Sequence, residues 1–235
     1  DTAYKLDPQA SLISKEGMVP AGDDDLSALQ LPSGKGRILH YLESSDNTNS
    51  YAVDLLLPDS GASRVAFYLP NLGVWKAQIE VFDLHSGALL ATRSIDNLWQ
   101  GVYEIFELSG KVRVVIHSAD WWYTVKLAGI FLDKSAEKTF GTRAGFLKED
   151  LDTRGNWKGV YGNWGFDIQG IPSSLPAQVF IKPVRLESKI PLIWPRDVRR
   201  FTYRKDPVLP DNSGLGYSFD NVQIAFNVIP IGEDG

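Results

Sequence analysis

Residues 101–117 read GVYEIFELSGKVRVVIH, and this stretch indicates the fold class more clearly than any other. It contains two short runs of β-branched, aliphatic and aromatic residues on either side of Ser109 and Gly110. Such runs predict β-strands, and a Ser-Gly pair is a typical turn between strands. We therefore expect strands over 101–107 and 112–117.

The same pattern continues in both directions along the chain. Turn-forming clusters separate the apolar runs, as in DNTN at 46–49, PDSG at 58–61 and HSG at 85–87. Further strands are expected at 37–42, 50–57, 63–69, 76–83, 89–94 and 124–132. Eight short strands without helical periodicity between them predict an all-β, antiparallel β-sandwich of the jelly-roll kind over residues 37–133.

The flanking regions differ in composition from this block. Residues 1–36 show little periodicity and predict an irregular N-terminal segment, whereas the polar residues 134–145 predict a linker. Residues 146–235 predict a second Gly- and Pro-rich β module, in which Pro restricts strands to short or edge positions. Its strands are expected at 166–169, 178–186, 201–204 and 222–229. The chain stops at IGEDG directly after a strand-like run, which we interpret as the sign of an incomplete module.

The composition excludes several classes of protein. The chain has 235 residues, with 24 Lys and Arg against 29 Asp and Glu, and this acidic balance argues against a nucleic-acid partner. No apolar run approaches the roughly 20 residues of a membrane-spanning helix, so no membrane partner is expected. The absence of Cys excludes disulfides, thiolate metal sites and Cys nucleophiles. Aromatic residues are numerous in this chain, with seven Trp, nine Tyr and eleven Phe.

Parts of the chain resemble β-sandwich accessory domains, similar to carbohydrate-binding modules, of secreted bacterial glycoside hydrolases and polysaccharide lyases. The segments HSGALLATRS (85–94), LSGKVRVVI (108–116) and LAGIFLD (127–133) occur in the order and spacing of that family. FLKEDLDTRGNWKGVYGNWGFDIQG (146–170) is similar to a second signature of the same proteins. FDNVQIAFNVI (219–229) is similar in texture to a strand of another family of carbohydrate-binding modules.

This resemblance implies a secreted, extracellular protein that binds a polysaccharide or oligosaccharide without catalysis, beside the rest of a parent enzyme. The first residues, DTAYKLDPQAS, are too polar for a signal peptide, so an export signal would already have been removed. No cofactor is required for such a role. Two alternatives stay open. In the first alternative, the region is a structural accessory domain that packs on a catalytic domain. In the second, it contributes to the active site of the parent hydrolase or lyase.

The strongest candidates for sugar binding are four consecutive residues, Asp120, Trp121, Trp122 and Tyr123. Aromatic rings stack on the C–H faces of sugars, and carboxylate or amide groups bond the hydroxyls. Side chains of a strand alternate between its faces, so three consecutive rings do not all enter a core. The family pattern has a small, polar loop here, which favours a specialised binding role. The alternative is that the rings cover a sheet edge or a neighbouring domain.

A second candidate group lies in the loop between the strands expected at 63–69 and 76–83. Trp75 would stack on a sugar, and Asn71 and Lys76 would contact hydroxyl or carboxylate groups. A ring that points into the core is the alternative for Trp75.

The segment GNWKGVYGNWG at 155–165 interleaves Gly with aromatic residues. Gly permits tight backbone conformations and the rings cover the exposed backbone, so we expect a structural turn that includes Trp157. Trp164 stands where the family has a polar residue, and it is a further binding candidate.

No residue of this chain is expected to be catalytic. The sequence lacks GxSxG, HExxH, P-loop and GxGxxG motifs. His40 and His117 fall within expected strands and His85 within a turn, which gives none of them an evident nucleophile.

Metal ligands cannot be assigned from the sequence. A structural calcium ion that fixes loops is an open alternative, because DDD at 23–25, SSDNTN at 44–49 and DNSG at 211–214 are oxygen-rich. None of these turns has the spacing of an EF-hand.

Overall fold

The computed structural model describes residues 14–19, 21–22, 24–44, 50–59, 61–74, 76–96, 98, 101–118, 124–137 and 141–184. Over these ranges the chain is all-β and forms three antiparallel sheets. The described residues all belong to one compact unit, residues 1–191. They include no helix that is long and apolar enough to span a membrane.

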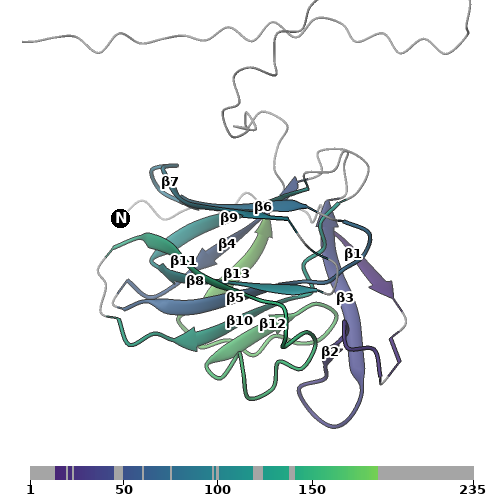
Figure 1. The fold of residues 1–235 in the computed structure, drawn as a ribbon. Coiled ribbons are helices and arrows are strands. Elements are labelled where there is room, and N and C mark those ends of the chain that lie inside the picture. Colours follow the sequence, from purple (N-terminus) through teal and green to yellow (C-terminus); the bar gives the residue numbers. More distant parts are fainter. Residues whose placement is uncertain are drawn as a thin grey trace, which may run out of the picture. The chain divides into compact units, whose positions relative to one another are not determined.

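Two five-stranded sheets pack face to face as a β-sandwich (Figure 1). Sheet I runs from edge to edge as β11 (Arg143–Asp150), β8 (Val102–Ser109), β5 (Ser63–Leu69), β10 (Gly129–Lys134) and β12 (Gly165–Ile168). Sheet II runs as β13 (Phe180–Val184), β4 (Ser50–Leu56), β9 (Lys111–Ser118), β6 (Ala77–Asp83) and β7 (Leu89–Ile95). A smaller sheet contains β1 (Ser14–Val19), β3 (Arg37–Ser44) and β2 (Leu29–Gln30).

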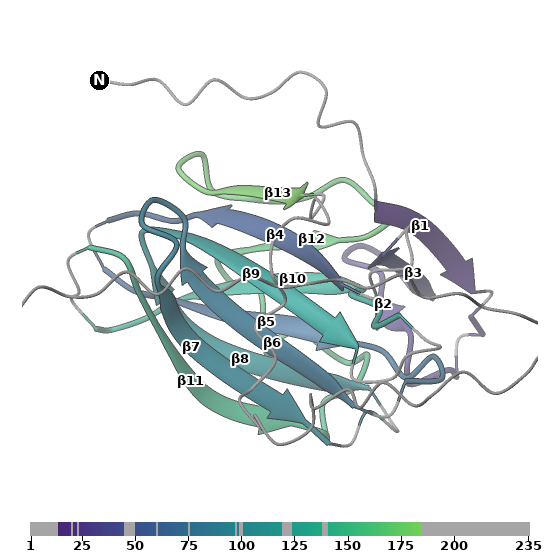
Figure 2. The same ribbon diagram turned by 90° about the horizontal axis from the view of Figure 1, so that it is seen from above.

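The strand pairing has the nested order of a jelly roll. The pairs β6 with β7, β5 with β8 and β4 with β9 enclose one another in sequence. An antiparallel bridge between Leu42 and Leu127 extends the nesting to β3 and the segment before β10. Figure 2 shows β4, β9, β6 and β7 of sheet II side by side. The predicted jelly-roll β-sandwich is confirmed.

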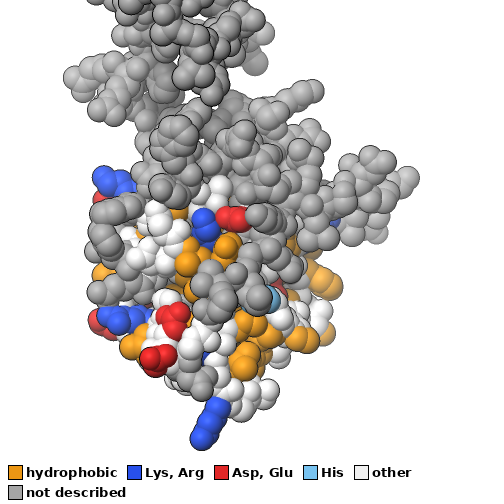
Figure 3. Space-filling view, turned by 90° about the vertical axis from the view of Figure 1, so that its right-hand side faces the viewer, with side chains coloured by type: hydrophobic (Ala, Val, Ile, Leu, Met, Phe, Trp, Pro, Cys, Tyr) orange, Lys and Arg blue, Asp and Glu red, His pale blue; other side chains and the backbone are white. Residues whose placement is uncertain are grey.

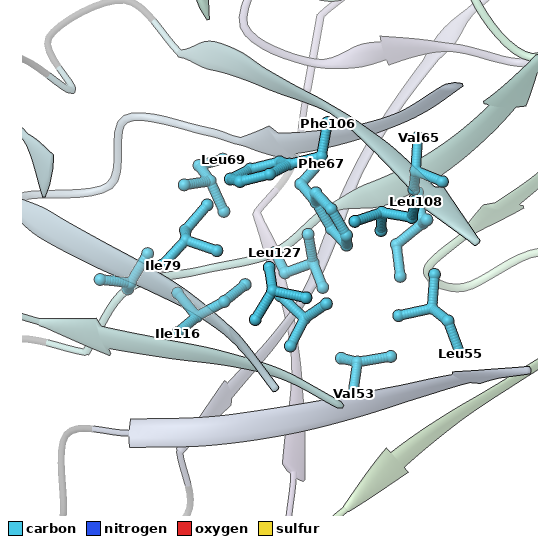
Figure 4. Close-up of a cluster of buried hydrophobic side chains, with 14 of the residues drawn as sticks. Val53, Leu55, Val65, Phe67, Leu69, Ile79, Phe106, Leu108, Ile116 and Leu127 are labelled. Atoms are coloured by element: carbon cyan, nitrogen blue, oxygen red, sulfur yellow. The ribbon is translucent and has the colours of Figure 1, made fainter. Parts of the chain in front are cut away.

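The main hydrophobic core lies between the two sheets. Because side chains alternate along a strand, Val102, Glu104, Phe106 and Leu108 of β8 point inward, and the three apolar ones belong to the core. They meet Ile79 and Ile116 from sheet II, and Figure 4 shows this cluster. The alternation that predicted the strands therefore also places the core.

The Ser-Gly turn after β8 moves the chain from one sheet to the other. Gly110 has a φ of 73°, and a Cβ there would lie 2.9 Å from the Cα of Thr142. Both constraints favour Gly at this position. The two runs that indicated the fold therefore lie in different sheets, and they do not form a hairpin.

The chain after residue 133 completes the two sheets. β11 extends sheet I beside β8, β12 extends it beside β10, and β13 extends sheet II beside β4. The linker expected at 134–145 connects two strands of one sheet, β10 and β11. The expected boundary between a sandwich over 37–133 and a separate module from 146 therefore differs from the structure as far as residue 184. A polar loop between strands resembles a linker in composition, which explains the difference.

The N-terminal region also differs from expectation. Within residues 1–36, which predicted an irregular segment, β1 and β2 pair with the two sides of β3. β2 has only two residues and β1 reads SKEGMV, so neither strand carries an alternating apolar pattern. Residues 185–235, with the strands expected at 201–204 and 222–229, lie outside the described residues.

Candidate functional site

The outer face of sheet I is covered by other parts of the chain, and we call it the covered face. The second hydrophobic cluster of the molecule lies on this face. It joins side chains of sheet I to side chains of the N-terminal segment and of the loop after β11. The contributors are Ala28, Leu29, Leu39, Ala66, Tyr68, Tyr103, Ile105, Ala128, Phe131, Trp157, Tyr161 and Ile168.

The loop that covers this face contains the GNWKGVYGNWG segment. Tyr161 stacks on Tyr103 with 4.6 Å between ring centroids, and Trp157 donates its indole N–H to the carbonyl of Gln30 at 2.8 Å. A Cβ on Gly155 would lie 1.8 Å from the carbonyl oxygen of Ala28, so only Gly permits this close approach. The expected structural turn, with Trp157 as backbone cover, is confirmed.

Asp150 fixes the start of the same loop. Its carboxylate accepts hydrogen bonds from the hydroxyls of Tyr161 at 2.5 Å and Thr153 at 2.6 Å. Burial raises the pKa of Asp150, but the hydrogen bonds from Thr153 and Tyr161 outweigh it and leave the pKa below its ordinary value. These hydrogen bonds hold the start of the loop in place.

Trp164 lies at the opposite end of β10 from Asn71. Its backbone N–H bonds the carbonyl of Leu132, and the ammonium group of Lys134 lies 5.8 Å from its ring centroid. Gly129 at the start of β10 pairs with Tyr68, close to Asn71 in the chain. Five residues of strand separate the two ends of β10, which is about 16 Å. Trp164 and the Asn71 loop therefore cannot form one compact sugar site.

The remaining candidates belong to one end of the sandwich, which we call the loop end. It is defined by Val74, Lys76, Ser118 and Thr124, the described residues that flank the two candidate loops. Ser118 pairs with Ala77, which directly follows Lys76. Thr124 bonds Glu43 on β3, and Figure 3 views this end of the molecule.

Trp75, Asp120, Trp121, Trp122 and Tyr123 lie outside the described residues. Their binding role stays a prediction. The described residues next to them in sequence meet at the loop end, as the pairing of Ser118 with Ala77 shows. The strand expected at 124–132 begins only at Gly129, after an isolated antiparallel bridge between Leu127 and Leu42.

Asn71 and Lys76 are both at the loop end, and each has a partner. The side-chain carbonyl of Asn71 accepts a hydrogen bond from the backbone N–H of Gly73 at 3.3 Å. The ammonium group of Lys76 lies 3.6 Å from the carboxylate of Asp96, and both side chains are exposed. An exposed pair of this kind is weak, so Lys76 remains accessible to a ligand.

A more rigid polar cluster is centred on Lys126. Its ammonium group lies 3.3 Å from a carboxylate oxygen of Glu43 and donates to the carbonyl of Thr124 at 2.8 Å. The hydroxyl of Thr124 donates to the same Glu43 carboxylate at 2.8 Å. The Lys126 and Glu43 side chains are only 11% and 16% exposed, so the cluster is held in place.

The phenol of Tyr51 lies in the same region of the sandwich. Its hydroxyl is buried and has no hydrogen-bond partner in the described part of the chain. Burial raises the pKa of Tyr51 well above its ordinary value, and the negative charge of Glu43 raises it further. Tyr51 therefore stays neutral and keeps an O–H donor.

The outer face of sheet II is more polar than the covered face, and we call it the polar face. Outward-pointing side chains here include Ser50, Asp54, Gln78, Glu80, Arg113 and His117. Arg113 makes a two-point contact with Asp54, at 2.7 and 2.9 Å. Gln78 donates to the hydroxyl of Thr92 at 3.1 Å. Hydrogen bonds between side chains thus connect adjacent strands across this face.

Three of these residues form a relay next to the loop end. The hydroxyl of Ser50 lies 2.9 Å from Nδ1 of His117, and Nε2 of His117 lies 2.9 Å from a carboxylate oxygen of Glu80. They come from the adjacent strands β4, β9 and β6. No His has an evident nucleophile in the sequence, whereas in the structure the hydroxyl of Ser50 lies beside His117. The sequence carries no signal for this contact, because it depends on the strand register.

The arrangement of the relay also suits a clamp that holds three strands together. Ser50 is 6% exposed and Glu80 is 8% exposed, so the hydroxyl is not presented openly to solvent. Both ring nitrogens of the half-buried His117 have a partner, the hydroxyl of Ser50 at Nδ1 and the carboxylate of Glu80 at Nε2.

A buried charged cluster lies between the sheets at the β7 and β11 edge. The guanidinium of Arg93 contacts Glu104 at 3.1 Å and Glu149 at 2.5 Å, and it lies over the ring of Phe146. Glu104 is completely buried, and its second carboxylate oxygen has no partner within the described residues. Burial raises the pKa of Glu104 to about 8, although the nearby Arg93 lowers it.

In the described part of the chain, no group of three or more His, Asp or Glu residues is arranged to hold a metal ion. Of the three turns considered for calcium, 211–214 and most of 44–49 lie outside the described residues. In the third turn, Asp25 accepts hydrogen bonds from the backbone N–H and the hydroxyl of Ser27. A structural calcium ion therefore stays a prediction.

Comparisons with family models, with curated proteins and with solved structures find no match to this chain. The class that the structure itself defines is a jelly-roll β-sandwich.

Proposed function

We propose that this jelly-roll domain binds glycans without catalysis, as part of an extracellular polysaccharide-degrading enzyme. The single observation that carries the proposal is that the described residues flanking the two candidate loops are paired at the loop end. Ser118, two residues before Asp120 in the sequence, pairs with Ala77, two residues after Trp75. A site assembled from several loops on a rigid sandwich is a common way to position binding residues.

The chemistry of the loop end supports the same proposal. A glycan needs fixed donors and acceptors for its hydroxyls and flat surfaces for its C–H faces. Lys126, Glu43 and Thr124 supply a cluster of fixed polar groups, and Asn71 and Lys76 supply accessible ones. Trp75, Trp121, Trp122 and Tyr123 are the proposed stacking residues, and Asp120 is a further polar contact.

Binding to a panel of soluble polysaccharides tests the proposal. We expect the intact chain to bind at least one of them, and the double substitution Trp121→Ala with Trp122→Ala to lower that affinity at least tenfold. The expected tenfold loss of affinity rests on the cost of removing one aromatic stacking contact, which is about 1–3 kcal/mol. Phe180→Ala is the matched control, because Phe180 is an exposed ring at the opposite end of sheet II.

Two results would contradict the proposal. The first is no binding by the intact chain to any polysaccharide, which would favour a structural accessory domain that packs on a catalytic domain. The second is equal binding by the intact chain and the double variant, which would place the site elsewhere on the molecule.

A hydrolytic role is a second candidate, and one observation favours it. Ser50, His117 and Glu80 have the hydrogen-bond order of a nucleophile, a general base and an orienting carboxylate. The low exposure of Ser50 favours the structural clamp. Covalent labelling of Ser50 by a serine-reactive phosphonate, abolished in His117→Asn, would support the hydrolytic role over the clamp.

A further inference from the structure

The two sheets of the sandwich approach each other at one of its open edges. β7 is an edge strand of sheet II and β11 is an edge strand of sheet I, and the two strands lie close together (Figure 2). Among the described strands, none pairs with the outer side of either one. Side chains therefore join the two sheets at this edge, without a shared backbone ladder.

Arg93 is the side chain that crosses from one sheet to the other here. It pairs with the core residue Ile79, so its side chain points inward from β7. Its guanidinium lies 3.1 Å from a carboxylate oxygen of Glu104 on β8 and 2.5 Å from one of Glu149 on β11. It also covers the ring of Phe146. One side chain of sheet II thus binds two strands of sheet I.

The two carboxylates are neighbours that share this one guanidinium. Glu104 and Glu149 are opposite each other in the pairing of β8 with β11, and like charges at such positions repel. The residue opposite Glu104 on its other side is the apolar Phe67 of β5, and the inward side chains of β6 are apolar as well. When Glu104 is protonated, one positive charge faces one negative charge. When Glu104 is ionised, the same positive charge faces two.

The closed edge favours the protonated form of Glu104. Its side chain is fully buried, and its second carboxylate oxygen has no hydrogen-bond partner in the described part of the chain. An ionised carboxylate that lacks partners is costly to bury. Burial raises the pKa of Glu104 to about 8, Arg93 opposes this rise and Glu149 adds to it. Contact with water would return the pKa toward 4.5.

We propose that Arg93, Glu104 and Glu149 form a proton-dependent latch between the two sheets. The latch holds β7 against β11 while Glu104 is protonated, and loss of the proton opens this edge and exposes the carboxylate to water. The opening is local, so the central strands of both sheets stay paired. The latch is independent of glycan binding at the loop end.

Amide hydrogen exchange of the intact chain, between about pH 5 and about pH 8, tests the latch. Dividing the intrinsic exchange rate at each pH by the measured rate gives the protection of each amide. If local opening frees Glu104, the protection of β7 amides should fall by about tenfold per pH unit, and at least a hundredfold over this range. The amides of β9, at the centre of sheet II, should stay better protected at every pH.

Two results would overturn the latch. The first is protection in β7 that is lower than in β9 but constant with pH, because the edge would then open with Glu104 still buried. The second is equal protection in β7 and β9 that falls in parallel, because only global unfolding would then expose Glu104.

Three variants sharpen the test. Glu104→Gln imitates the protonated carboxyl, so the protection of β7 should stay constant within about twofold. Glu137→Gln neutralises an exposed carboxylate and, as the matched control, should keep the fall of the parent. Glu149→Gln leaves Glu104 as the sole carboxylate on Arg93, which should lower the pKa of Glu104 and reduce the fall. A fall in Glu104→Gln as large as in the parent would overturn the latch, and so would an unchanged fall in Glu149→Gln.

Discussion

The two outer faces of this sandwich are built from the same kind of strand but differ in what lies on them. The covered face buries Tyr68, Tyr103 and Phe131 beneath Trp157 and Tyr161, in an aromatic layer. The polar face joins its strands through side-chain hydrogen bonds, as in the relay of Ser50, His117 and Glu80. The aromatic residues of the covered face stabilise the fold, and the sugar-binding proposal concerns only those of the loop end.

The largest effect should come from removing the centre of the covered face. Trp157→Ala should lower the free energy of unfolding by about 3–5 kcal/mol, because it deletes a buried indole and its hydrogen bond to Gln30. Urea unfolding measures it. Val160→Ala, at an exposed site in the same loop, is the control and should change the stability little. An equally small effect of both would mean that the loop does not support the fold.

A second variant tests how closely the covering loop approaches the N-terminal segment. Gly155→Ala should cost about 3 kcal/mol, because its Cβ would overlap the carbonyl oxygen of Ala28. Gly145→Ala places a Cβ in open space and should be nearly neutral. Thermal unfolding of both variants makes the comparison. Equal melting temperatures would show that residues 28 and 155 are not in contact.

The third prediction concerns Glu104, which follows Tyr103 on β8 and points to the opposite side, between the sheets. Its pKa is raised to about 8 in the fold against 4.5 ordinarily, so the folded protein holds a proton that the unfolded chain loses. Stability from this group is complete below about pH 4.5 and is lost as the pH rises toward 8. The slope reaches about 1.4 kcal/mol per pH unit.

Glu104→Gln imitates the protonated carboxyl and should remove this slope. The variant should match the parent protein at pH 4 and be the more stable of the two at pH 8, measured by urea unfolding. Glu137→Gln, at an exposed position, should keep the slope of the parent. A parent protein whose stability does not fall between pH 5 and pH 8 would contradict the assignment.

The smallest effect is expected on the polar face. Ser50→Ala should lower the free energy of unfolding by about 1–2 kcal/mol, because it leaves Nδ1 of the half-buried His117 without a partner. Ser94→Ala, on the exposed edge strand β7, is the control for loss of a hydroxyl. Equal stabilities of the two variants would show that the relay does not clamp the strands.

Much of the fold could be predicted because its signal is local. Short runs of aliphatic, aromatic and β-branched residues between turn clusters give the positions of β3 to β9. β11 was missed because Phe146 and Leu147 belong to an edge strand whose burial pattern does not alternate. The expectation that Trp157 covers the backbone of the 155–165 turn is also confirmed.

The candidate site was less predictable because it depends on register. Ser50 and His117 are 67 residues apart, and they meet only because β4 and β9 pair in one register. A shift by one residue would turn both side chains toward the opposite face. For the same reason, Trp164 could not be separated from Asn71 until the pairing of β10 with β5 and β12 was known.

The sequence by itself determined the all-β class, the positions of most strands and the two loops that carry the binding hypothesis. These features follow from residue type and short-range periodicity, which the local chain contains. The tertiary structure alone decided which strands share a sheet, that the chain as far as residue 184 joins one sandwich, and that the charges of the loop end are paired. Those features arise from contacts between residues that are far apart in the chain, and no local pattern encodes them.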